Sequence, residues 1–93
     1  MNSQVAHLHI ASFILLTKPD ALAQVIEHLT KSPEVEVVTS DVSGKIVFLV
    51  EAQHERRIMD IVDALRELSV VLSVSMVEHH VDELSAMLEE ISP

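Results

Sequence analysis

The 93-residue chain is 48% apolar with one glycine and three prolines, which indicates a single folded domain with a modest core. Its net charge is −9, from fifteen acidic residues against six Lys or Arg. This charge excludes a typical surface for nucleic acids or anionic membranes, because those ligands require clustered cations. It favours a basic partner instead. The absence of cysteine excludes disulfides and thiolate chemistry, and the lack of a signal-type N-terminus or of an apolar run of about 20 residues predicts a cytoplasmic protein.

The first two predicted elements are a strand and a helix. Residues 7–16 form an apolar run that predicts a strand with two apolar faces. A helix is expected to follow it, capped by Thr17 and ended by 31–33, because apolar residues between them recur with helical spacing.

The middle of the chain predicts a β-hairpin. Residues 35–39 alternate in a more polar pattern that is typical of an edge strand. Residues 41–44 include the only glycine, Gly44, which we expect to supply a positive φ in the turn. The apolar run at 46–50 is the second strand of this hairpin.

The C-terminal part predicts a helix, a strand and a further helix. An apolar stripe at helical spacing runs through 54–68. Residues 70–79 then read as the last strand, and 81–91 as a short amphipathic helix. Residues 1–80 are therefore expected to form the domain and 81–93 a C-terminal tail.

This β-α-β-β-α-β order predicts an α+β fold, the ferredoxin-like sandwich, in which a four-stranded antiparallel sheet carries both helices on one face. Although the sheet is expected to be antiparallel overall, its two central strands, 7–16 and 46–50, are predicted to run parallel. The other face of the sheet has only the tail helix available to cover it.

That second face is predicted to be apolar, and an uncovered apolar face is a candidate binding site. Val47 and Leu49 are expected on it. In the last strand, Leu72, Val74 and Met76 are expected to face the helices, which leaves on the open face Val71, Ser73, Ser75, Val77 and His79. Strand 7–16 allows two orientations, with the core formed either by Ile10, Ser12 and Ile14 or by Ala11, Phe13 and Leu15.

The histidines suggest metal binding, but the pattern is weak. His7 and His9 are expected near His79 and His80 on a neighbouring strand, where three of the imidazoles would complete a zinc or copper site. The simpler interpretation is that they are polar residues at strand ends, and we predict no metal and no cofactor. The serines lack triad spacing and the single glycine excludes a phosphate loop, so we expect no enzyme activity.

Three segments resemble the strands of NapD-type chaperones: 9–15 (HIASFIL), 44–52 (GKIVFLVEA) and 71–80 (VLSVSMVEHH), the last with the family's closing His. The resemblance covers nearly the whole chain in order and spacing. The chain departs from the family at 33–34, where Pro-Glu replaces Pro-Gly, at 69–70, which lacks glycine, and at Glu78, where an aromatic is common.

The resemblance implies a cytoplasmic chaperone for the periplasmic nitrate reductase. Such a protein binds the twin-arginine signal peptide of the catalytic subunit on its open sheet face and delays export until the molybdenum cofactor is inserted. The acidic composition suits the basic part of such a peptide and the apolar face suits its helix-forming part. The sequence leaves open a monomer or a weak homodimer.

The expected peptide site combines an apolar floor, small residues for close approach and acids for the arginines. Its predicted residues are Ala11, Ser12, Phe13, Val47, Leu49, Glu51, Ser73, Ser75, Val77, Glu78 and His79. The alternatives are a small-molecule regulatory domain and a His-based metal-binding module. A further hypothesis is that the tail helix covers the same face until the peptide displaces it.

Overall fold

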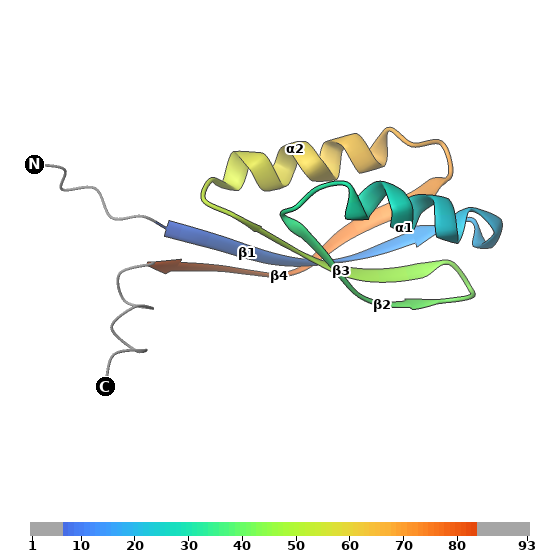
Figure 1. Ribbon diagram of the computed structural model, residues 1–93, viewed down its shortest axis with the longest axis horizontal. Helices are drawn as coiled ribbons and strands as arrows, with labels where there is room; N and C mark the ends of the chain where they lie inside the picture. Colours follow the sequence, from blue (N-terminus) through green and yellow to red (C-terminus); the bar gives the residue numbers. More distant parts are fainter. Residues whose placement is uncertain (1–6, 84–93) are drawn as a thin grey trace, which may run out of the picture.

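Four strands and two helices alternate along residues 7–83, the part of the chain that the computed structural model describes. The elements are β1 (His7–Thr17), a 3-10 turn (Pro19–Ala21), α1 (Leu22–Thr30), β2 (Val35–Asp41), β3 (Lys45–Ala52), α2 (Glu55–Arg66) and β4 (Val71–Glu83). The strands form one sheet in the order β2-β3-β1-β4, with both helices on the same side of it (Figure 1). The predicted ferredoxin-like fold is confirmed.

Every neighbouring pair of strands is antiparallel, including the central pair β1 and β3. The prediction that the two central strands run parallel was therefore wrong. The connection through α1 makes β1 parallel to β2, and the tight β2–β3 hairpin then reverses the chain, so that β3 runs against β1.

The core lies between the sheet and the helices. Its largest members, Phe13 of β1 and Phe48 of β3, are paired across the strands and stacked, with ring centroids 5.3 Å apart and planes 17° apart. The helices add their apolar stripes, among them Val25 and Leu29 of α1 and Ile58, Ile61, Val62 and Leu65 of α2. No helix within residues 7–83 is long and apolar enough to cross a membrane.

The end of β1 is fixed by Thr17 and Gly44. The sequence suggested that Thr17 caps the following helix, but it does not. It is the buried last residue of β1, and its hydroxyl donates to the carbonyl of Val70 at 2.8 Å. Its N–H donates to the carbonyl of Gly44 at 2.8 Å, and Gly44 has the expected positive φ, 103°. A Cβ on Gly44 would lie 2.1 Å from the Thr17 carbonyl oxygen, so only glycine fits this turn.

The last strand is longer than predicted. β4 continues to Glu83, because its final residues still pair with the start of β1, up to His7 opposite Glu83. Residues 81–83 are thus strand rather than the start of the predicted tail helix. The remainder of that helix, 84–91, lies outside the described residues.

Candidate functional site

The register of the sheet shows which residues lie on the side away from the helices, here called the open face. Side chains alternate along a strand, and directly paired residues share a face. In β1, Ala11 and Phe13 are each 1% exposed and lie in the core. The open face of β1 therefore carries Ile10, Ser12, Ile14 and Leu16. Of the two orientations considered for this strand, the second is the one observed, and the prediction of Ala11 and Phe13 as site residues was wrong because both are enclosed beneath the helices.

β3 has the orientation that the sequence predicted. Ile46, Phe48 and Val50 are buried in the core, so Val47, Leu49 and Glu51 lie on the open face. Val47 is opposite Ile14, and Leu49 is opposite Ser12. Five large apolar side chains that the two central strands place on the open face, here called the apolar stripe, are Ile10, Ile14, Leu16, Val47 and Leu49. All of them are partly or well exposed, and no described element covers them.

β4 follows the predicted alternation only in part, because its pairing with β1 is irregular at two places. Ser73 and Ser75 pair with Leu16 and Ile14 and lie on the open face, as predicted. Val77 is an extra residue at the first irregularity, and its side chain is 59% exposed.

The irregularity at Val77 changes which side chains reach the open face. Glu78 pairs with Ser12 on the open face, whereas His79 pairs with buried Ala11 on the helix side. The prediction of His79 as an open-face residue was wrong, since the extra residue reverses the alternation beyond it.

The second irregularity, between Leu16 and Thr17, affects the start of β4. Val71 pairs with buried Thr17 and packs against the core, although it was expected on the open face. Leu72, which was expected to face the core, is the extra residue at this irregularity and is 64% exposed. Met76 pairs with buried Phe13 and lies on the helix side, as predicted, although it is 46% exposed. Only Val74 of the predicted inward set is buried.

Three carboxylates on the open face gather at one end of it. Glu51 lies beside Ile10, and Glu36 and Glu78 flank the Leu49–Ser12 pair from the two outer strands. We call these three carboxylates the acidic end. Lys45, opposite Leu16 and Asp41, lies at the other end of the stripe. The open face thus changes from acidic to apolar along its central strands.

A fourth carboxylate near this end, that of Glu34, already forms an ion pair within the protein. Its two oxygens accept hydrogen bonds from the guanidinium of Arg57, at 2.7 Å and 3.2 Å. That hydrogen bond is the main reason why the pKa of Glu34 lies below its usual value and the pKa of Arg57 above its own. The pair ties α2 to the segment before β2. Glu78 also has a partner in this structure, the imidazole of His80.

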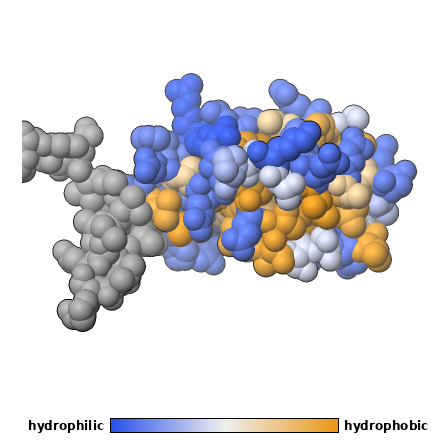
Figure 2. All heavy atoms as spheres, in the orientation of Figure 1, coloured by the Kyte–Doolittle hydropathy of each residue, from blue (hydrophilic) through white to orange (hydrophobic). Residues whose placement is uncertain are grey.

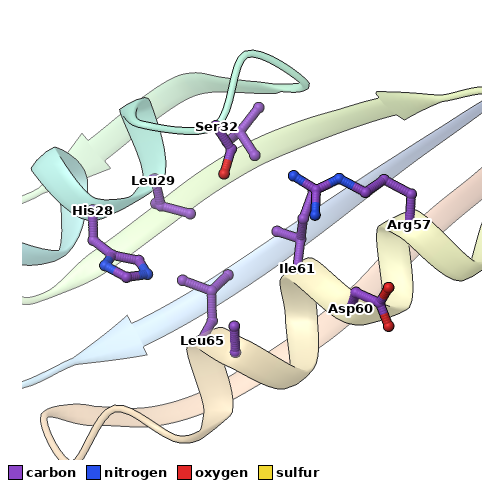
Figure 3. Close-up of a pocket in the computed structure, with 9 residues that line it drawn as sticks. His28, Leu29, Ser32, Arg57, Asp60, Ile61 and Leu65 are labelled. Atoms are coloured by element: carbon purple, nitrogen blue, oxygen red, sulfur yellow. The ribbon is translucent and has the colours of Figure 1, made fainter.

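A separate pocket lies between the helices, on the opposite side of the molecule. Leu29 of α1 and Ile61 and Leu65 of α2 point toward one another across it, with His28 and Arg57 at its rim (Figure 3). Its volume is about 110 Å³. Sites for drug-sized ligands usually enclose about 300–1,000 Å³, so this pocket is small for a metabolite site.

The two sides of the molecule differ in polarity. Hydrophilic side chains cover the helices, whereas hydrophobic ones gather lower down, along the strands (Figure 2). A broad apolar surface beside a set of carboxylates can bind an amphipathic, basic segment of another chain.

The model of the NapD protein family matches residues 8–83, which include both helices and all of this sheet except His7. The chain belongs to the NapD family. It is 28% identical over 75 residues to Chaperone NapD of Escherichia coli K12 and to that of Shigella flexneri. The aligned residues cover 80% of this chain and 86% of each relative. The solution structure of the E. coli Tat proofreading chaperone NapD matches with a TM-score of 0.73 and 26% identity, covering 83% of this chain and 82% of that one.

The resemblance seen in the strand segments is therefore confirmed as membership of the NapD family. The matched relatives are named chaperones, which supports the predicted chaperone function over an enzymatic one. The roles of the individual site residues stay predictions. Sequence reasoning missed Leu16, Glu36 and Lys45, which the register places on the open face.

Proposed function

We propose that this NapD-family protein is a cytoplasmic chaperone that binds the twin-arginine signal peptide, here called the leader, of the catalytic subunit of periplasmic nitrate reductase. Binding would hold the precursor back from export until its cofactor is inserted and it has folded. The observation that carries the proposal is the apolar stripe with the acidic end beside it, in a chain whose structural relative is a Tat proofreading chaperone.

The dimensions of the stripe suit one helix. From Ile10 to Leu16 the strand covers about 20 Å, at about 3.3 Å per residue, which matches about 13 helical residues at 1.5 Å each. A helix about 10 Å wide covers roughly two strands spaced about 4.8 Å apart. Ser12, Ser73 and Ser75 would allow the peptide backbone to approach closely, while Ile14, Val47 and Leu49 would bury its apolar side chains.

The charges on the open face would orient the leader. A twin-arginine leader has its basic part before its apolar part, so the two arginines would lie at the acidic end, near Glu36, Glu51 and Glu78. The apolar segment would then run along the stripe toward Leu16. The C-terminal end of a leader helix, which carries partial negative charge, would approach Lys45.

Titration of a synthetic leader into the purified protein, followed by amide chemical shifts, tests this proposal. We expect saturable one-to-one binding with shift changes at Ser12, Val47 and Leu49 and none at the pocket between the helices. A leader whose apolar segment is replaced by serines is the matched control and should bind far more weakly. Shift changes confined to the helix side would contradict the proposal.

The carboxylates of the acidic end are expected to act mainly on the association rate. The variants Glu51→Gln and Glu78→Gln should each weaken leader binding by about 0.2–1 kcal/mol, up to about fivefold, because exposed ion pairs contribute little. The loss should appear as slower association at low salt and disappear near 1 M salt, where charges are screened beyond about 3 Å.

Glu67→Gln, which removes the same charge at the end of α2, is the control for the acidic end. Stopped-flow fluorescence with a labelled leader measures these rates. An equal effect of Glu67→Gln would show that only the net charge of the protein matters, and not its placement on the open face.

A further inference from the structure

Two imidazole rings converge on the helix side of the sheet, away from the proposed leader site. The Nδ1 atom of His9 lies 3.1 Å from Nε2 of His79, and the ring centroids are 5.3 Å apart with the planes 24° apart, so the two nitrogens face each other. His9 is on β1 and His79 on β4, so 69 intervening residues separate two nitrogens that the strand pairing brings together. Both side chains are half-buried.

This geometry results from the irregularity at Val77. With regular alternation His79 would have followed Ser73 and Ser75 onto the open face. The extra residue instead places it with Ala11 on the helix side, diagonally across from His9. The pair lies at the end of the sheet where β3 stops, since Ala52, its last residue, pairs with His9. We call this segment, residues 7–11 of β1 with residues 79–83 of β4, the arm (Figure 1).

The separation of the two nitrogens is close to what a shared metal ion requires. Zinc binds imidazole nitrogen at about 2.0–2.1 Å, which puts two ligands of a tetrahedral ion about 3.3 Å apart. The His9 and His79 nitrogens would need to separate by only a few tenths of an ångström. The ion would replace the hydrogen bond between the two nitrogens, and the ring that donates in this bond would carry its proton on its other nitrogen instead.

We propose that His9 and His79 form a two-histidine site for a divalent transition-metal cation. Imidazole nitrogens favour Zn²⁺, Cu²⁺ or Ni²⁺ over Mg²⁺ and Ca²⁺. Within residues 7–83 no set of three or more potential ligands converges, so water completes the coordination and the ion exchanges readily. The net charge of −9 favours cation binding, and the bound ion links β1 to β4 across the arm.

Titration of tag-free protein with Zn²⁺, by calorimetry and by histidine imidazole NMR signals, tests this site. We expect one ion per chain. His9→Gln and His79→Gln should each weaken binding at least about tenfold, as the loss of groups that hold a metal commonly does. His80→Gln is the matched control, because His80 is the next residue on β4 but lies on the open face opposite Ile10, and it should bind as the wild type does.

A second measurement does not depend on the variants folding. Co²⁺ added to the wild type should produce paramagnetic shifts that are largest for residues of the arm, such as Leu8, Ala11 and Val81. Mg²⁺ should produce none. Absence of saturable Zn²⁺ binding, shifts centred elsewhere in the chain, or unchanged affinity in His9→Gln would overturn the proposal.

Discussion

Replacing Val47 by aspartate is expected to weaken leader binding by about 100-fold. Val47 lies at the centre of the apolar stripe, between Ile14 on β1 and Thr39 on β2. The variant loses apolar burial worth about 1.5 kcal/mol and places a carboxylate against an apolar segment, for a total of about 3 kcal/mol. Calorimetric titration with the synthetic leader measures the change.

The chain offers two controls with the same substitution. Val42→Asp lies in the β2–β3 turn, where the side chain is 87% exposed, and Val38→Asp lies on β2, where it is 53% exposed. Both add the same charge without removing a residue of the apolar stripe, so leader affinity should stay within about twofold of the wild type. If the Val47→Asp protein has the wild-type free energy of unfolding and binds the leader as tightly as these controls do, the open face is not the leader site.

The neighbours Phe13 and Ile14 are expected to give opposite results when each is changed to alanine. Phe13 is 1% exposed and stacks on Phe48, so Phe13→Ala should lower the free energy of unfolding by about 3–5 kcal/mol. Ile14 lies on the open face, so Ile14→Ala should cost about 1 kcal/mol of stability or less. It should, however, weaken leader binding about tenfold through lost apolar contact.

Urea unfolding and leader titration on the same two variants measure both quantities. The comparison is informative because the two residues are adjacent in the chain and lie on opposite faces of the sheet. A loss of stability in Ile14→Ala as large as that in Phe13→Ala would mean that the open face is covered in the free protein. That outcome would revive the hypothesis that residues beyond Glu83 lie over it.

The sequence predicted the fold because each element carries its own signal. The turn with Gly44 and the helical spacing of apolar residues in α1 and α2 were sufficient for the order of elements. β3 was oriented correctly, since Glu51 continues the parity of Val47 and Leu49 and cannot easily be buried. β1 could not be oriented in the same way because both of its faces are apolar.

One signal for β1 was nevertheless present. The chain has only two phenylalanines, and the expected position of Val47 and Leu49 on the open face puts Phe48 on the opposite face. Aromatic pairs on neighbouring strands stabilise a sheet, so placing Phe13 beside Phe48 would have selected the observed orientation. The irregularities in β4 had no comparable signal, because no glycine or proline marks Leu72 or Val77. The position of His79 therefore had to come from the structure.

The register irregularities in the two outer strands also help the protein to avoid association with itself or with incompletely folded chains. An exposed strand edge is a template on which another chain can add a strand, and a chaperone meets incompletely folded chains repeatedly. β2 breaks its pairing register at Val38, and β4 does so near Leu72 and again at Val77. Bulges of this kind bend an edge and interrupt its row of hydrogen-bonding groups. Sheet extension, the first step toward amyloid-like association, is thereby disfavoured at both edges, while no described element covers the apolar stripe between them.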